Sequence, residues 1–145
     1  MYFRKVRMIL LYTNLLLILS LIYFYFNSIK NYTECILAFL LVSVIISSQL
    51  FWRNPMRDTS VHKIDAIIAK VCILSFIFYT ILFKLPTDDL VVTYAFLLLC
   101  IISTAGFSNY YSSRKWCSHP HINSHALLHY FCFIATFFAF WFDLV

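Results

Sequence analysis

The stretch HPHINSHALLHYFCFIATFFAFWF, residues 119–142, decides how this chain folds. Four of the five histidines of the protein lie in its first eleven residues, and an almost unbroken run of aromatic and aliphatic residues follows them. About 20 consecutive apolar residues are enough to cross a bilayer as a helix. The stretch therefore predicts a membrane helix over residues 120–142 that carries titratable side chains at its start.

Four further apolar runs precede this stretch, over residues 8–26, 35–51, 61–83 and 90–107. Of the 145 residues, 63% are hydrophobic and only 12% are charged, which is about half the charged fraction of an average soluble domain. Spans of this length have to be helical, because lipid offers no partner for open backbone groups. We expect an all-α bundle of about five transmembrane helices that forms a single domain over residues 1–145.

Basic residues are distributed unevenly between the two ends of these helices. With the N-terminus on the inner side, eight of them lie on that side and two on the other. The eight are Arg4, Lys5, Arg7, Arg53, Arg57, Lys63, Arg114 and Lys115, and the two are Lys30 and Lys84. Cytoplasmic loops carry the excess of basic residues in membrane proteins. We therefore expect an N-in topology with a retained first helix, and we attribute the net charge of +5 to topology rather than to nucleic-acid binding.

This topology brings polar residues of three helices into the inner half of the membrane. The second helix ends near Ser48, the third begins with His62 and Asp65, and the fifth begins with the histidines. Residues three or four apart share one face of a helix, which holds for His62 with Asp65 and for His125 with His129. Two histidines at this spacing can bind one metal ion. We expect Ser48, Asp65, His125 and His129 to face one interior cavity, since an intramembrane carboxylate should not face lipid.

Two other kinds of residue stand out in the apolar runs. Lys70 lies inside the third run, and we expect its ammonium to reach toward the inner headgroups. The five cysteines form no CxxC pair, and four of them lie inside apolar runs, where a free cysteine behaves as a small buried hydrophobe. Cys117 is the exception, because it adjoins the histidines.

The polar residues resemble the pattern of the CREST superfamily of membrane hydrolases, which includes the alkaline ceramidases and the progestin and adipoQ receptors. That pattern is SxxxH, then an Asp, then a late HxxxH; here the pieces read SQLFW from Ser48, HKIDAIIA with Asp65, and HALLH from His125 to His129. The resemblance implies zinc on three histidines and a zinc-bound water that attacks an amide. Trp52 stands where the family has its first zinc histidine, and the likeness covers about a third of a chain with about five helices instead of seven.

Several functions are compatible with these observations. The resemblance implies a zinc-dependent lipid amide hydrolase, in which Asp65 orients a ligand or the water and Ser48 steadies the oxyanion. The expected zinc ligands are His125, His129 and His62, with His121 as an alternative for the third. The main alternative is a non-catalytic membrane subunit of a larger assembly, such as a respiratory complex or a virion membrane, and a weaker one is haem ligation by His129. In each case we expect a multi-pass integral membrane protein in contact with membrane lipids and, for a subunit, with other membrane chains.

Overall fold

Five helices and no strand make up the described part of the chain in a computed structural model. They are α1 (Tyr2–Asn27), α2 (Tyr32–Arg53), α3 (Ser60–Phe83), α4 (Asp88–Arg114) and α5 (His119–Phe140). The structure describes residues 2–85 and 87–141, and for residues 2–7 it describes the backbone only. Each helix contains a stretch long and apolar enough to cross a membrane. The expected all-α, multi-pass architecture is therefore confirmed.

The helix ends differ from the ends of the apolar runs, most of all in α4. This helix continues to Arg114, seven residues beyond the predicted end at residue 107, through a polar segment without Gly or Pro. Hydropathy marks where lipid contact ends, whereas a helix ends at a cap or a breaker. In α5 the helix stops at Phe140, and Phe142, the predicted end, lies outside the described residues.

Side-chain caps begin α3 and α4 as their sequences predict. Thr59 Oγ1 accepts the backbone N–H of His62 at 3.3 Å, and Thr87 Oγ1 accepts that of Leu90 at 3.4 Å. Each cap satisfies one of the N–H groups that the first turn of a helix leaves without an intrahelical partner.

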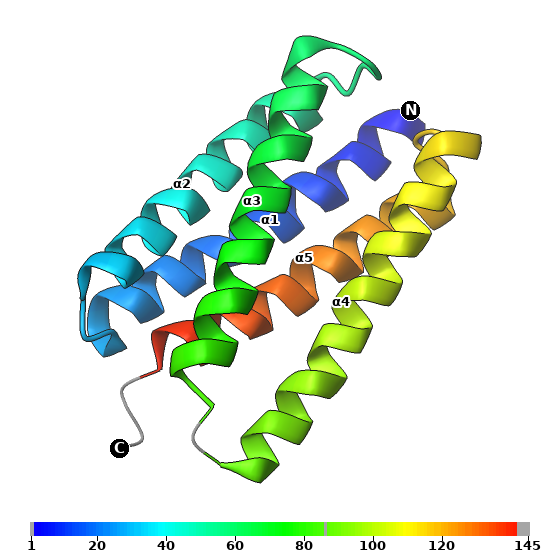
Figure 1. Cartoon of the computed structure of the whole chain (residues 1–145). Coiled ribbons are helices and arrows are strands. Elements are labelled where there is room, and N and C mark those ends of the chain that lie inside the picture. The colour runs from blue at the N-terminus through cyan, green and yellow to red at the C-terminus, as the bar shows by residue number, and fades with distance from the viewer. Residues whose placement is uncertain (1, 86, 142–145) are drawn as a thin grey trace.

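The helices run in alternating directions, so that α1, α3 and α5 begin at the end of the bundle where α2 and α4 end (Figure 1). We call this the histidine end, because His62 and the histidines of α5 lie there. The pairs α1–α2, α2–α3, α3–α5 and α5–α1 pack closely and form a ring of four helices, while α4 packs on α5 alone among the close pairs. Figure 1 shows α3 and α4 in front, with α5 running behind and between them. Within the described residues α3 and α4 are therefore not a closely packed pair.

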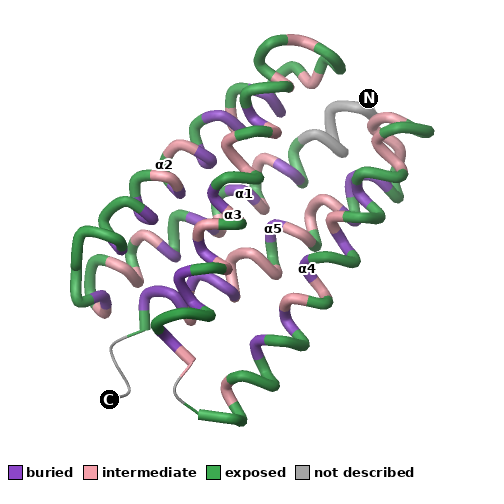
Figure 2. The backbone as a smooth tube through the Cα atoms, in the orientation of Figure 1, coloured by how far each residue is buried: buried purple, intermediate pink, exposed green. Residues whose placement is uncertain are grey.

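Buried and exposed residues alternate along every helix, with the buried ones on the faces turned toward neighbouring helices (Figure 2). The main core lies inside the ring of four helices and includes Leu17, Leu41 and Phe76, whereas Ile101 and Ala135 belong to a separate cluster between α4 and α5. Outward faces carry large apolar side chains on all five helices, as lipid contact requires.

Polar side chains join the helices across this core. Asn14 Nδ2 donates to the carbonyl of Ile45 at 3.0 Å, which ties α1 to α2, and the hydroxyls of Ser20 and Thr136 lie 2.6 Å apart between α1 and α5. The chain has one glycine, so close backbone packing of the GxxxG type is not open to it. Interhelical hydrogen bonds hold the register of the helices instead.

The end of the bundle opposite the histidine end holds a buried ion pair. Lys84 Nζ lies 2.8 Å from Glu34 Oε1, and both side chains are almost completely buried. Glu34 also accepts hydrogen bonds from the Tyr79 hydroxyl at 2.9 Å, from the Ser28 hydroxyl and from the Lys30 backbone N–H at 3.1 Å. This carboxylate is therefore surrounded by donors and paired with a cation, which is the arrangement that a buried charge needs.

Candidate functional site

The carboxylate of Asp65 joins α2 to α3 near the histidine end. Ser48 Oγ donates to Asp65 Oδ1 at 2.7 Å, and Ser47 Oγ lies 2.8 Å from the same oxygen and 3.2 Å from the carbonyl of Val44. Asp65 is 6% exposed, so it faces the bundle interior and not lipid, as expected. Oδ2 has no hydrogen-bond partner among the described residues. The sequence predicted Ser48 for this site, and Ser47 joins it because consecutive hydroxyls on α2 reach one oxygen.

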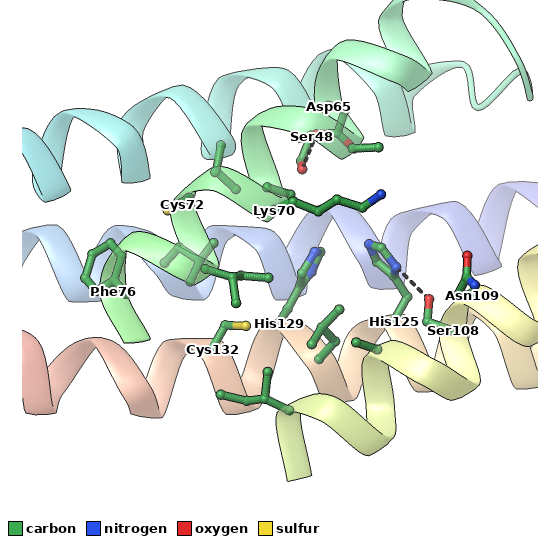
Figure 3. A pocket seen from close by; sticks show the side chains of 18 of the residues that line it. Ser48, Asp65, Lys70, Cys72, Phe76, Ser108, Asn109, His125, His129 and Cys132 are labelled. Atoms are coloured by element: carbon green, nitrogen blue, oxygen red, sulfur yellow. Dashed lines mark hydrogen bonds between the residues drawn. The ribbon is translucent and has the colours of Figure 1, made fainter. Parts of the chain in front are cut away.

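His125 and His129 lie one above the other on α5, with ring centroids 4.8 Å apart. The Nδ1 atom of His125 lies 3.0 Å from Ser108 Oγ on α4, and that of His129 lies 3.1 Å from Thr13 Oγ1 on α1. Figure 3 shows both imidazoles rising from α5 toward α3. Hydroxyls of two flanking helices thus hold the rings by one nitrogen each and leave the Nε2 atoms without a partner among the described residues.

Ser108 and Thr13 were not predicted as part of the site. Ser108 could have been predicted from its depth in the bundle. It lies six residues before the end of α4, which is about 9 Å along the helix at 1.5 Å per residue. His125 lies six residues after the start of α5 and has the same depth. No comparable signal marks Thr13, because its contact depends on how α1 is rotated against α5.

His62 and His121 have a different role, since they cap the helices that they begin. The Nδ1 atom of His62 accepts the backbone N–H of Asp58 at 3.1 Å, and that of His121 accepts the backbone N–H of Cys117 at 3.1 Å. Both donor residues have positive φ, 62° and 54°, and each directly precedes an N-cap residue. Glu34 makes the same contact at the start of α2 with the backbone N–H of Lys30, whose φ is 56°. Three helices of this chain therefore begin with the same capping contact. A residue with a left-handed backbone conformation donates its N–H to the side chain of the residue four positions later.

An aromatic cluster surrounds these two capping histidines. The ring of His62 stacks on Phe51 at 5.0 Å and meets Trp116 at 5.2 Å, and His121 lies 5.0 Å from the same indole. Cys117 packs against this cluster with a half-buried side chain, and burial raises the pKa of its thiol. A thiol that stays protonated is a poor nucleophile and a poor metal ligand, so Cys117 contributes its backbone N–H rather than its sulfur.

Trp52 fills the space beside His125. Its indole ring lies 5.2 Å from the imidazole of His125, and its side chain is 2% exposed. The indole N–H is buried and has no hydrogen-bond partner. Trp52, which stands at the position of the first histidine in the CREST pattern, therefore lies next to His125, and its side chain has a hydrogen-bond donor but no metal ligand.

A cavity of about 270 Å³ brings the predicted site residues together. Its polar wall includes Ser48, Asp65, His125 and His129, and its apolar wall, farther from the histidine end, includes residues of the core. Helices α3, α4 and α5 supply most of the wall, so the cavity lies beside the pair of helices that do not pack closely. Lys70 also lines the cavity, and Figure 3 shows its extended side chain directed toward the end where His125 lies.

Potential metal ligands that line this cavity include Asp65 and four histidines, namely His62, His121, His125 and His129. His125 and His129 present unbonded Nε2 atoms, whereas the Nδ1 atom of His62 is engaged as a cap and its ring is packed between Phe51 and Trp116. Among the described residues no group of three or more His, Cys, Asp or Glu side chains is arranged to hold a metal ion. Zinc on His125, His129 and His62 therefore stays a prediction.

The site thus combines a carboxylate held by two serines, two imidazoles with one free nitrogen each, a buried indole N–H and an apolar wall. These groups can bind a polar group, exchange a proton with it, and hold an apolar chain beside it. No protein-family model, curated protein or solved structure matches this chain.

Proposed function

We propose that this protein binds a membrane lipid in the cavity between α3, α4 and α5. The observation that carries the proposal is the position of the cavity beside two helices that are not closely packed on each other. A lipid can move sideways through such a gap without leaving the bilayer. Deep sites between helices of a bundle are a common place for ligands that are mostly apolar with a few polar groups.

The two walls of the cavity match the two parts of a lipid. Asp65 lies five residues from the start of α3, about 7.5 Å along the helix, which is the depth of a headgroup and its linkage. The apolar wall lies closer to the bilayer centre, where Val44, Phe76 and Ile101 line the cavity. A lipid of the leaflet at the histidine end therefore fits with its polar part among the histidines and an acyl chain along the core.

A second function, hydrolysis of the bound lipid, is favoured by one observation. The three pieces that resemble the CREST pattern come from α2, α3 and α5 and line the same cavity, and the residue at the missing ligand position lies beside His125. The free Nε2 of an imidazole can accept a proton from a water molecule next to a lipid ester or amide. The proposed chemistry rests on these two imidazoles, since no group of three or more potential metal ligands is arranged to hold an ion in the described part of the chain.

A purely structural role in a larger assembly has no specific observation in its favour. The exposed apolar side chains are spread over all five helices rather than gathered on one face, which is the distribution that lipid contact alone requires. In a membrane an interface between chains is as apolar as the surface that faces lipid, so this distribution does not distinguish the two.

Filling the cavity tests the lipid proposal. Ala105 lines the cavity from α4, and Ala95 lies exposed on the same helix. We expect the full chain, purified in mild detergent, to retain lipid that native mass spectrometry detects as a bound species. Ala105→Trp should remove this species, because the indole takes the space, while Ala95→Trp should leave it. Equal lipid retention by both variants would contradict the proposal.

A further inference from the structure

Glu34 and Asp65, the two buried carboxylates in the described part of the bundle, have very different hydrogen-bond and charge partners. Glu34 is 0% exposed and has Lys84 Nζ at 2.8 Å, together with hydroxyl and backbone donors on both oxygens. Asp65 is 6% exposed and is bonded only by two serine hydroxyls, both at Oδ1. No cation lies within ion-pair distance of Asp65 among the described residues.

Oδ2 of Asp65 has no partner among the described residues and is open to a ligand in the cavity. Asp65 lines the cavity, and a carboxylate in an apolar interior is costly unless it is paired. Lys70 lines the cavity too, but it lies five residues farther along α3, about 140° around the helix at 100° per residue. The other titratable groups that line the cavity are His62, His121, His125, His129, Tyr94, Cys72 and Cys132.

We propose that the cavity recognises the primary ammonium group of a membrane lipid, which Asp65 pairs through Oδ2. This inference rests on the proposed binding of lipid in the cavity and names the chemical class of that lipid. A primary ammonium has three N–H donors, so it can pair with Oδ2 and still donate to an unbonded Nε2 of His125 or His129. A trimethylammonium group has no N–H and cannot make these bonds.

This group occurs in lipids with a phosphate and in lipids without one, and the cavity has residues suited to tell phosphatidylethanolamine from a long-chain alkylamine. In phosphatidylethanolamine the ammonium is joined to a phosphate, for which the ammonium group of Lys70 is a suitable donor. In a long-chain alkylamine the ammonium stands alone, and only Asp65 and the imidazoles are needed. Loss of Lys70 should therefore weaken binding of the phospholipid and leave that of the amine unchanged.

The experiment uses the full chain in phosphatidylcholine nanodiscs that contain a small fraction of a photoactivatable lipid. Three probes are compared, namely phosphatidylethanolamine, a long-chain primary amine and phosphatidylcholine, each with the photoactivatable group in its chain. We expect crosslinking to cavity peptides to be about 5-fold or more stronger for a primary-amine probe than for the phosphatidylcholine probe. Asp65→Asn should remove this preference, because the amide keeps an oxygen for the two serines but has no charge.

Matched variants separate the possible outcomes. Asp89→Asn removes an exposed carboxylate on α4 and should leave the preference unchanged. Lys70→Met should lower crosslinking of phosphatidylethanolamine alone if that lipid is the source of the amine. If all three probes label the cavity equally in the wild type, or if Asp65→Asn keeps the preference, the amine inference is wrong while lipid binding stands. If Ala105→Trp leaves the labelling of every probe unchanged, lipid binding itself is wrong.

Discussion

The indole of Trp52 lies 5.2 Å from the imidazole of His125, with the two ring planes at 60°. Trp52 comes from the C-terminal end of α2 and His125 from the start of α5, and 72 residues separate them in the chain. This contact places the residue that departs from the CREST pattern next to the residues that keep it.

Replacement of Trp52 by histidine tests whether that contact decides metal binding. Trp52→His places a third imidazole beside His125 and His129, and three histidines with one open position are a common zinc site. We expect zinc content, measured by elemental analysis after purification without chelator, to rise to about one ion per chain. Trp52→Phe keeps an aromatic ring without a ligand atom and should show no rise.

The unmodified chain supplies the comparison for that measurement. Stoichiometric zinc that is lost in the double variant His125→Ala with His129→Ala would support the hydrolase expected from the CREST resemblance. Failure of Trp52→His to bind more zinc than Trp52→Phe would show that the three positions do not converge.

The serine pair on α2 should contribute measurably to stability. Ser48→Ala removes a hydrogen bond to a buried carboxylate, a type of bond that contributes about 1.5–3 kcal/mol. Ser43→Ala is the matched control, because Ser43 is half-buried on the same helix and bonds only the carbonyl of Phe39 in its own helix. The free energy of unfolding, measured in mixed micelles, should be clearly lower for Ser48→Ala and little changed for Ser43→Ala. A larger loss for Ser43→Ala would contradict the role given to Asp65.

The ion pair at the opposite end of the bundle should contribute strongly to stability, and its loss should be rescued by a second substitution. Lys84→Met leaves Glu34 buried without its cation, and breaking a buried pair in this way costs about 3–5 kcal/mol. Adding Glu34→Gln removes the orphaned charge and should restore most of the lost stability. Lys63→Met, at an exposed position, serves as the control. If the double variant is less stable than Lys84→Met alone, the charge is not what destabilises the single variant.

Topology can be tested by labelling single cysteines, introduced after the five native ones are replaced. The structure rules out Ser28 as a reporter, because it is 7% exposed and bonded to Glu34. Tyr32, which is 92% exposed, and Ser113, which is exposed beyond the cavity at the end of α4, are accessible positions at opposite ends of the bundle. The basic-residue bias predicts that an impermeant maleimide added from outside labels Tyr32→Cys and not Ser113→Cys. Labelling of Ser113→Cys alone would reverse the predicted orientation.

Much of the candidate site could be predicted from span lengths and residue spacing. Asp65 lies five residues after the start of α3, and Ser48 lies five residues before the end of α2, so the two residues have the same depth. In antiparallel neighbouring helices, residues of equal depth lie side by side. The same reasoning placed His62 correctly at the histidine end, yet it did not predict that its Nδ1 atom bonds a backbone N–H. A capping contact depends on the left-handed backbone at Asp58, which the spacing of residues does not reveal.

The sequence by itself determined that this chain is a bundle of five membrane helices, because an apolar run of sufficient length is a local property that lipid converts into a helix. It also determined which polar residues share a depth. Only the tertiary structure decided that α3 and α4 are not a closely packed pair and that Trp52 packs on His125. It also decided that Asp65 has no cation within ion-pair distance among the described residues. The physical reason is that membrane helices are apolar on all sides, so no amphipathic stripe marks the inward face. A few contacts between helices, such as Asn14 with Ile45 and Ser20 with Thr136, set how each helix is rotated.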